Sequence, residues 1–287
     1  MVTISIVNYR SHQVTEGCIR ELSASLRSLQ YRILVRDNSE ASEIESLQKS
    51  ISHLGAPVLY FSSPENPGFG SGHNLNFWEV EHGAQDVFLI LNPDISLPDT
   101  EAIPKMLEHC TGMRIVSCVI ETAANGKVWF SGGFFGKVTG EPTVSRARFS
   151  EPLRRTEFVT GCCLMISTAL FRSLDGFDES YFMYSEDVDL SLRARELGAD
   201  MVVVNRRILH SIGSGERGSY SDLYLYEGTK NRLRCLRQHK HGIYPIGLAY
   251  MLLKYSVIRS LQLAIRSRHP VRQVKAVWRG IFDGVLK

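Results

Sequence analysis

Three short apolar runs of the sequence each end in Asn or Asp. The side chains concerned are Asn8, then Asp37 and Asn38, then Asn92 and Asp94. Asn and Asp also favour ordinary turns, so any one of these clusters is better explained as a turn. Three clusters at one edge of a parallel sheet instead indicate a ligand site, because ligands bind beyond the carboxyl ends of such strands.

A second candidate site is the group of carboxylates Glu186, Asp187 and Asp189 at the expected start of a helix. An acid-rich first turn that complements the helix dipole would explain the group structurally. The apolar residues 182–184 precede it directly, and apolar surroundings would raise a carboxyl pKa and suit a general base. Asp187 and Asp189 are two residues apart and diverge around the helix, so at most one of them faces the site.

Residues 65–74, with the sequence Glu-Asn-Pro-Gly-Phe-Gly-Ser-Gly-His-Asn, form a glycine-rich segment. Glycines let the backbone approach a ligand closely and offer N–H groups to an anion at the start of the following helix, expected over 75–82. The segment matches neither the Walker loop, which ends in Gly-Lys-Ser/Thr, nor the dinucleotide-binding fingerprint. Alone it is a weak signal.

The elements that must position these residues alternate between strand and helix. In the first hundred residues we expect strands at 2–8, 31–37, 58–61 and 87–91, and helices at 14–29, 42–54 and 75–82. This alternation predicts an α/β fold with a Rossmann-like, mainly parallel central sheet flanked by helices.

The second half has a different pattern. Residues 126–150 are rich in Gly, Ser, Thr and Arg, which indicates hairpins and a mobile loop. Beyond them we expect strands at 158–167 and 201–205, a helix at 167–174, and a helix that starts near the carboxylates and ends at Gly198.

The chain has 287 residues, of which 44% are hydrophobic and 22% are charged. This composition excludes a disordered or fibrous protein and suits one large domain or two small ones. The net charge of +3 is too mild to indicate nucleic-acid binding. No uninterrupted apolar run reaches about 18 residues and no cleavable leader is recognised, so we expect a cytoplasmic protein that does not cross the membrane.

The cysteines show neither a CxxC pair nor another metal-finger spacing. They are too sparse for a disulfide scaffold, so we expect reduced, partly buried thiols. They are Cys18, Cys110, Cys118, Cys162, Cys163 and Cys235.

Positive charge is concentrated at the C-terminal end. From His239 onward there is a single acid, Asp283, against the cations Lys240, Lys254, Arg259, Arg266, Arg268, Arg272, Lys275, Arg279 and Lys287. Residues 247–266 are expected to form a largely apolar helix with interspersed cations. Such a helix either packs on protein, within the chain or in a homodimer, or lies on a membrane surface, and the sequence favours neither.

Taken together, the motifs resemble the inverting glycosyltransferases of family 2, which have the GT-A fold, and within them the rhamnosyltransferase-like branch. The resemblance rests on residues 7–9, 35–39, 66–74, 91–94, 160–163, 176–179 and 186–190, and on His210 with Gly213 and Ser214. The motifs occur in the family's order from residue 2 to about residue 235.

The resemblance implies a site for a nucleoside diphosphate sugar. Asp37 would accept hydrogen bonds from a pyrimidine ring, and the backbone around Asn8 and Tyr9 would line the base. The full set of implied donor-binding residues is Asn8, Tyr9, Asp37, Asn38, Asn66, Gly70, Gly72, Asn74 and Asn92.

The resemblance also implies a divalent cation, Mg²⁺ or Mn²⁺, and a catalytic base. Asp94 and His210 would be the metal ligands, while Asn92 replaces the first acid of the family's Asp-x-Asp motif. Taken in isolation, His210 is better explained as a structural histidine. Asp187 would be the base, with Gly161, Glu186 and Asp189 on the acceptor side or in support.

From these implications we expect a GT-A domain at 1–235, with a nucleotide-binding half at 1–95 and an acceptor half at 96–235, and a basic amphipathic helical extension at 236–287. The expected activity is inverting transfer of rhamnose from dTDP-rhamnose to a glycan or lipid-linked glycan in bacterial surface polysaccharide synthesis. The alternatives are a UDP-hexose-dependent transferase and a non-catalytic nucleotide-sugar-binding protein. The expected location is the cytoplasm, with peripheral contact at the inner face of the membrane.

Overall fold

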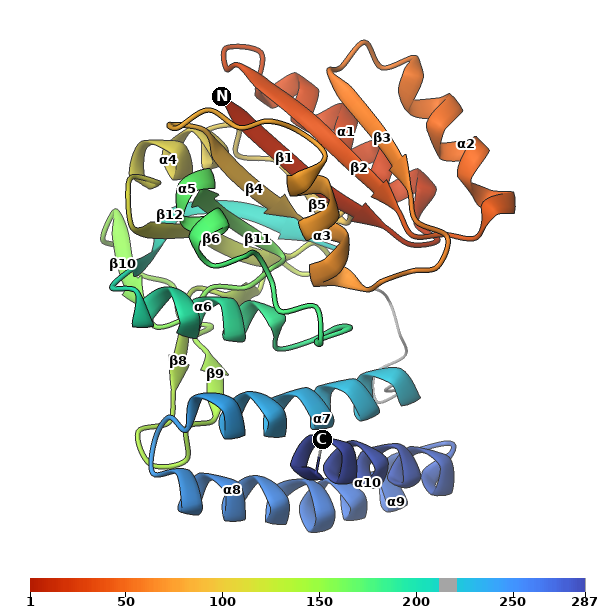
Figure 1. Cartoon of the computed structure of the whole chain (residues 1–287), viewed down its shortest axis with the longest axis vertical. Coiled ribbons are helices and arrows are strands. Elements are labelled where there is room, and N and C mark those ends of the chain that lie inside the picture. Colours follow the sequence, from red (N-terminus) through yellow and green to blue (C-terminus); the bar gives the residue numbers. More distant parts are fainter. Residues whose placement is uncertain (212–220, 287) are drawn as a thin grey trace.

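The computed structural model describes residues 1–211 and 221–286, and its N-terminal part alternates strands and helices as predicted (Figure 1). Apart from the edge strand Val58–Ser62, the strands are buried over most of their length, because both faces of the parallel sheet are covered. The elements are β1 (Val2–Asn8), α1 (His12–Ser25), β2 (Tyr31–Asp37), α2 (Ala41–Ser52), β3 (Val58–Ser62), α3 (Phe69–Trp78) and β4 (Val87–Leu91).

The middle of the chain completes the sheet. Its elements are β5 (Ile95–Ser96), α4 (Ala102–His109), β6 (Arg114–Thr122), β7 (Val128–Phe130), β8 (Gly133–Phe135), β9 (Pro142–Val144), β10 (Leu153–Thr156), β11 (Cys163–Ser167), α5 (Thr168–Ser173), α6 (Glu186–Glu196) and β12 (Asp200–His210). The antiparallel pair of β8 and β9 confirms a hairpin within 126–150. The strand expected at 158–167 is shorter, and the one expected at 201–205 extends to His210.

The central sheet has the strand order β10-β12-β6-β11-β4-β1-β2-β3. Strands β4, β1, β2 and β3 are parallel, and β12 is parallel to β6, whereas β11 lies antiparallel to both β4 and β6. This arrangement confirms the α/β class and the mainly parallel sheet. Because β11 runs in the opposite direction, its first residues lie at the edge where its neighbours end.

The polar ends of the strands meet at one edge of the sheet, as the sequence predicts. Asn8 is paired in register with Asp37, and β11 begins opposite the end of β4, with Cys163 facing Leu91. The last residue of β12, His210, pairs with Ile95 just after β4. The ends of β1, β2, β4 and β12 and the start of β11 therefore gather the candidate site residues.

Helix α3 begins at Phe69, so the expectation of a loop followed by a helix at 75–82 is wrong. Gly70 and Gly72 lie inside this helix and are buried. A Cβ at Gly70 would lie 2.9 Å from the Cβ of Phe177, and one at Gly72 would lie 2.9 Å from Cγ2 of Val7. These glycines let α3 pack closely on β1 and on the loop at Phe177, which is a packing role.

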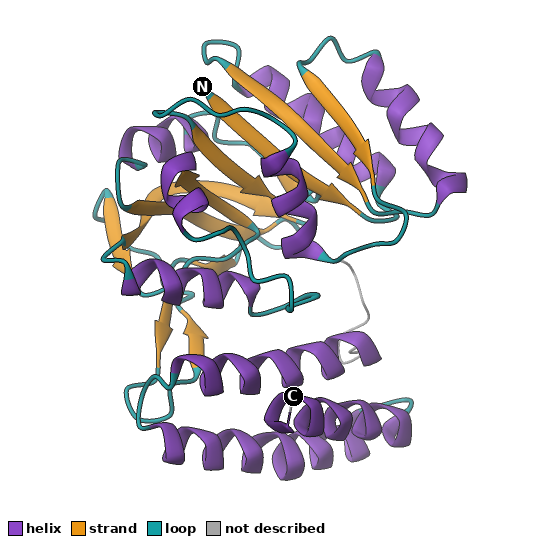
Figure 2. Cartoon of the chain, in the orientation of Figure 1, coloured by secondary structure: helices purple, strands orange, loops and turns teal. Residues whose placement is uncertain are grey.

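Helices after residue 221 form a separate layer beneath α6 and the β8–β9 hairpin (Figure 2). They are α7 (Asp222–His239), α8 (Tyr244–Leu253), the π-helical η1 (Lys254–Arg259), α9 (Ser260–Arg266) and α10 (Pro270–Leu286). The layer has its own apolar cluster, in which Leu233, Met251 and Val277 meet from three helices. Helix α7 belongs to this layer, so the boundary expected at 235/236 falls within a helix.

Close approach of α10 to α7 depends on two glycines. A Cβ at Gly280 would lie 2.6 Å from the carbonyl oxygen of Tyr226, and one at Gly284 would lie 2.6 Å from that of Lys230. Because α7 packs chiefly on α10, the helical layer is held together within the chain.

Helices α8, η1 and α9 form one continuous helix, Tyr244–Arg266, of 23 residues. Among the described residues it alone is long and apolar enough, by length and composition, to cross a membrane, and 17% of its most apolar window is buried. The sequence indeed contains no uninterrupted apolar run of about 18 residues, and this helix is apolar enough only on average. Counting only uninterrupted apolar runs overlooked a window that contains isolated cations such as Lys254 and Arg259.

The cysteines are free and buried in the structure, which agrees with the expected reduced thiols. Cys118 and Cys163 approach each other in the core, with 3.9 Å between their sulfur atoms. Burial raises the pKa of Cys18 and Cys162 above the ordinary thiol value. A raised thiol pKa disfavours the reactive thiolate, so these residues act as core side chains.

Candidate active site

The carboxylate of Asp187 lies at the start of α6 and is held by two backbone amides. The N–H of Gly161, just before β11, donates to Oδ2 at 2.9 Å, and the N–H of Val188 donates to Oδ1 at 2.8 Å. The preceding residues Tyr184 and Ser185 are both left-handed, with φ of 71° and 73°. Two adjacent non-glycine residues in this region store strain of the kind that concentrates at functional sites.

Gly161 is the residue that allows this contact. A Cβ at this position would lie 2.9 Å from the ring of Phe69 and 3.6 Å from the Cβ of Asp187. A side chain here would force the ring of Phe69 to shift, whereas the distance to Asp187 is an ordinary van der Waals contact. The assignment of Gly161 to the support of the site therefore has a steric basis.

Two carboxyl groups share this part of the site. Burial raises the pKa of Asp187, although the amides that bind it act in the opposite direction. Burial and the neighbouring charge of Asp187 raise the pKa of Glu186 well above the ordinary value, and its Oε2 has no hydrogen-bond partner. A carboxylate with a raised pKa accepts a proton more readily, which suits Asp187 to general-base chemistry.

Asp94 and His210 come together across the strand ends. His210 Nε2 lies 3.0 Å from Asp94 Oδ2, and the backbone N–H of Ser211 donates to the Asp94 carbonyl at 2.9 Å. The second carboxylate oxygen of Asp94 is buried without a partner, as is His210 Nδ1. The remaining motif residues on this side, Gly213 and Ser214, lie outside the described residues.

These two side chains suit a hard divalent cation. Mg²⁺ is commonly held by one or two carboxylates together with phosphates, and imidazole also binds first-row divalent metals. The described residues contain no group of three His, Cys, Asp or Glu side chains that could hold a metal alone. The pair therefore fits a cation whose other ligands come from a bound diphosphate.

On the donor side, the buried carboxylate of Asp37 already has several partners. Its Oδ1 accepts from Asn8 Nδ2 at 2.8 Å and from the Ser39 amide at 3.0 Å, and its Oδ2 accepts from the Tyr60 hydroxyl at 2.7 Å. Tyr9, by contrast, is 46% exposed beside them. The structure brings Asn8, Tyr9 and Asp37 together, and their contact with a base stays a prediction.

Asn38 lies next to this group and reaches the glycine-rich segment. Its Nδ2 donates to Asn66 Oδ1 at 3.2 Å and to the Gly68 carbonyl at 3.3 Å, while its Oδ1 is buried without a partner. Gly68 has φ of 102° and a Cβ there would lie 2.3 Å from the Phe182 carbonyl oxygen. The segment is thus fixed against the loop that leads to Asp187.

Asn74 is buried, whereas a residue that binds the donor is expected at the surface. Its amide binds both backbone groups of Phe177, each at 2.8 Å, and its Nδ2 also donates to Glu179 at 3.1 Å. With its donor and acceptor engaged inside the protein, Asn74 positions the loop from Gly176 to Glu179. This corrects its assignment to direct donor binding.

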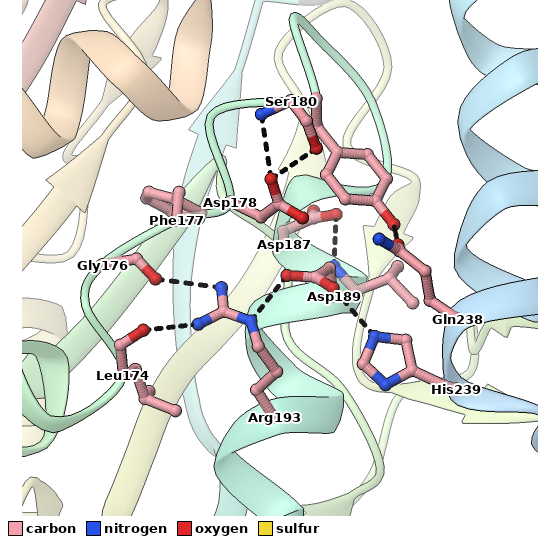
Figure 3. A network of polar contacts seen from close by, with 12 residues as sticks. Leu174, Gly176, Phe177, Asp178, Ser180, Asp187, Asp189, Arg193, Gln238 and His239 are labelled. Carbon is pink, nitrogen blue, oxygen red and sulfur yellow. Dashed lines mark hydrogen bonds and ion pairs between the residues drawn. The ribbon is translucent and has the colours of Figure 1, made fainter. Parts of the chain in front are cut away.

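Asp189 binds different partners from Asp187, as expected of two residues that diverge around the helix. It accepts from Arg193 Nε at 2.7 Å and lies 2.8 Å from His239 Nε2 (Figure 3). Arg193 also donates to the carbonyls of Leu174 and Gly176. Asp189 therefore connects α6 to the loop before it and to the end of α7.

The sequence reasoning missed several of these partners. Arg193 lies four residues after Asp189, a spacing that commonly indicates a helical ion pair and could have identified it. Tyr60 and His239 contact Asp37 and Asp189 from distant parts of the sequence. No local pattern points to either of them.

The chain is similar in sequence to several known glycosyltransferases. No protein-family model matches the chain. The hexosyltransferase Agl10 of low-salt glycan biosynthesis in Haloferax volcanii is 27% identical over 201 residues, covering 68% of this chain and 61% of the relative. The rhamnosyltransferase WbbL of Escherichia coli K12 is 25% identical, covering 67% of this chain and 76% of WbbL. An N-acetylglucosaminyl-diphospho-decaprenol L-rhamnosyltransferase of Mycobacterium tuberculosis is 39% identical over 70 residues, 24% of this chain and 23% of that enzyme.

Solved structures show the same fold. GalNAc-T7 with UDP, GalNAc and Mn²⁺ has a TM-score of 0.68 at 13% identity, covering 98% of this chain and 55% of that one. The mannosyltransferase PcManGT of Pyrobaculum calidifontis with GDP-Man and Mn²⁺ has a TM-score of 0.60 at 10% identity, covering 99% of this chain and 76% of that one. The fold is that of the GT-A glycosyltransferases, and the resemblance to that class is confirmed.

The pair of His239 and Asp189 predicts a pH-dependent stability. Burial alone would lower the pKa of His239, but the carboxylates of Asp189 and Glu196 outweigh it and raise the pKa. A raised folded-state pKa contributes stability that is complete below the unfolded value of about 6.5 and is lost as pH rises through the folded value. His239→Gln should therefore destabilise the protein by up to about 1 kcal/mol near pH 6 and by less near pH 9. Urea unfolding at both pH values measures this, and an equal loss at both would contradict it.

Proposed function

We propose that this chain is an inverting glycosyltransferase that moves a sugar from a nucleoside diphosphate to a glycan or lipid-linked glycan acceptor. The observation that carries the proposal is the carboxylate of Asp187, held by the Gly161 amide at the edge where Asp94 and His210 meet. The chain spans 61% of the length of the Haloferax relative. The activity and the substrates of this chain are therefore proposals and are not taken over from that relative.

In this proposal Asp187 removes the proton from the acceptor hydroxyl. The hydroxyl oxygen then attacks the anomeric carbon from the face opposite the diphosphate, and the carbon–oxygen bond to the diphosphate breaks. A single displacement inverts the configuration at the anomeric carbon. Hydrogen bonds from the Gly161 and Val188 amides fix the carboxylate for this transfer, and its raised pKa favours accepting the proton.

Asp94 and His210 would hold the divalent cation, Mg²⁺ or Mn²⁺. When bound, the cation neutralises the charge that develops on the leaving diphosphate. Support comes from the unpartnered Oδ1 of Asp94 and from the Mn²⁺ present with two structures of this fold. With Asn92 in place of a second acid, the site would depend more strongly on the phosphates of the donor.

For the donor sugar, we propose rhamnose from dTDP-rhamnose. Two relatives are rhamnosyltransferases, and one of these acts on a sugar joined to decaprenol through a diphosphate. The alternative donor is a UDP-hexose, as UDP and UDP-GlcNAc are present with two structures of this fold. A panel of nucleotide sugars, tested for the one that raises the melting temperature most, separates these alternatives.

Asp187→Asn tests the base. The amide has nearly the same shape but cannot accept the proton, so turnover should fall at least roughly 10²-fold while donor affinity changes little. The control is Glu196→Gln, the same chemical change at an exposed position of the same helix. Steady-state kinetics and donor titration measure both variants. Turnover of Asp187→Asn within a few-fold of wild type would mean that the chain only binds the nucleotide sugar or uses another base.

Asp94→Ala and His210→Ala test the metal site through binding alone. Each should weaken binding of a nucleoside diphosphate by about 10-fold or more with Mg²⁺ or Mn²⁺ and have little effect in EDTA, because the side chain acts through the ion. Asp99→Ala removes a nearby carboxylate that pairs with Arg206 and serves as control. Isothermal titration calorimetry gives the affinities. An equal loss with and without metal would assign Asp94 and His210 a structural role.

We also propose that the helical layer docks on anionic membrane surfaces. Along Tyr244–Arg266 and the residue before it, exposed apolar side chains recur every three or four residues and so form one stripe. The stripe consists of Ile243, Ile246, Tyr250, Leu253, Val257, Leu261 and Ile265. Exposed cations accompany it at Arg266 and, on α10, at Lys275 and Arg279. Apolar residues beside cations fit an anionic lipid surface, where each cation contributes about 1 kcal/mol.

Sedimentation with vesicles of equal parts phosphatidylglycerol and phosphatidylcholine tests the docking. Binding should weaken as salt rises, because salt screens surface charges. Leu261→Gln with Ile265→Gln should reduce binding at least about threefold, since both side chains would leave the lipid. Leu197→Gln changes an exposed apolar residue outside the layer and should have no effect. If the wild-type protein does not bind these vesicles even at low salt, the docking proposal fails and the stripe instead contacts protein.

A further inference from the structure

A small recess lies between the loop that leads to Asp187 and the helical layer. Tyr184 lines it from the loop, Tyr224 and Arg232 line it from α7, and Tyr255 and Arg259 line it from η1. The recess is partly open and has a volume of about 40 Å³, several times what a single water molecule needs, so it has room for a compact group of a few atoms. The lining is thus a cluster of phenol and guanidinium groups beside the active site.

Arg232 in this recess has no counter-charge from the described part of the chain. The half-buried guanidinium donates from Nη1 to the Tyr255 hydroxyl at 3.2 Å and forms no ion pair with a described carboxylate. Glu141, the carboxylate that contributes to its electrostatic environment, is bound by Lys254. A charge withdrawn from water is unfavourable without a partner, so the recess favours an anion.

The donors in the recess indicate which anion. A guanidinium group has planar, forked N–H groups that match phosphate oxygens, and phenol hydroxyls can donate to the same oxygens. Ring contacts keep the site in place, since Tyr184 and Tyr224 meet edge to face with 5.1 Å between their ring centres. A phosphate group satisfies both the charge and the size of the recess.

We propose that this recess binds a phosphate of a lipid-linked sugar diphosphate, the acceptor of the reaction. The inference rests on the proposed transfer to a lipid-linked acceptor and names where that acceptor's phosphate lies. Tyr184 is three residues before Asp187, so their Cα atoms are at most about 11 Å apart. The recess that Tyr184 lines together with Arg232 therefore lies near the proposed base. The outer side of η1 carries the exposed Val257 and Ile258, which would face the lipid.

Binding of geranyl diphosphate tests this without glycosyl transfer. The titration is made in EDTA and with saturating nucleoside diphosphate, so that the probe cannot report on the donor site. Wild type should bind geranyl diphosphate and not geraniol. Arg232→Gln should weaken the binding at least about 10-fold, as expected for loss of a charged hydrogen bond. Lys240→Gln removes an exposed cation at the end of α7, outside the stripe and the recess, and should retain wild-type affinity.

A second pair of variants separates binding from folding. Arg232→Lys keeps the charge, and Tyr255→Phe keeps the ring while removing the hydroxyl that Arg232 contacts. Both should weaken the binding less than Arg232→Gln, with an unchanged circular dichroism spectrum. Equal binding of geranyl diphosphate by wild type and by a folded Arg232→Gln would overturn the proposal, as would displacement of the probe by nucleoside diphosphate or equal binding of geraniol.

Two further measurements separate this proposal from a site for a lipid headgroup and from the proposed glycosyl transfer. If Arg232→Gln weakens binding to phosphatidylglycerol vesicles but not to geranyl diphosphate, the recess takes a lipid headgroup and the proposal fails. In kinetics, Arg232→Gln should raise the KM for a diphosphate-linked acceptor at least about 10-fold and leave the KM for the donor unchanged. If the chain binds geranyl diphosphate through Arg232 yet transfers no sugar, the proposed function fails while the phosphate site stands.

Discussion

The contact between the Gly161 amide and the Asp187 carboxylate joins the start of β11 to the start of α6 at the site. It requires a strand that enters the sheet antiparallel, so that β11 begins where β4 ends. A side chain at Gly161 would also meet the ring of Phe69, since a Cβ there would lie 2.9 Å from it. The position of the carboxylate that would act as base therefore depends on the topology of the sheet and on close packing at this glycine.

Much of the first half of the fold follows from local sequence pattern, because short apolar runs alternate with amphipathic segments. The elements that were missed lack such a pattern. Helix α7 buries Glu227, Thr229 and Asn231 along with its leucines, so its apolar period is weak. The sequence of helix α3 predicts a loop because Gly70 and Gly72 are poor helix formers. Close packing on Phe177 and Val7 overrides that low propensity, which only the folded structure reveals.

The candidate site was predictable where strand ends determine it and unpredictable where partners are distant in sequence. Asp94 and His210 meet because β12 ends beside the residue that follows Asp94. Asn74 shares its residue type with the donor-side asparagines, yet its partner Phe177 is 103 residues away and turns it into a support for a loop. Residue type identifies what a side chain can bind, whereas only tertiary contacts decide whether that capacity is already used within the protein.

In the proposed function, the helical layer would hold the enzyme at the surface that carries the acceptor, which the sheet alone cannot do. A polar donor reaches the strand ends from water, but a lipid-linked acceptor is confined to a surface, so an enzyme held at that surface meets it at a higher effective concentration. The continuous helix Tyr244–Arg266 places Tyr255 toward Arg232 and exposes Val257 on its other side. If both proposals hold, one element presents an apolar stripe to lipid and a phosphate recess to the active-site loop. Arg232 would then lack an ion pair with any described carboxylate because such a pair would occupy the place where the acceptor's charge must bind.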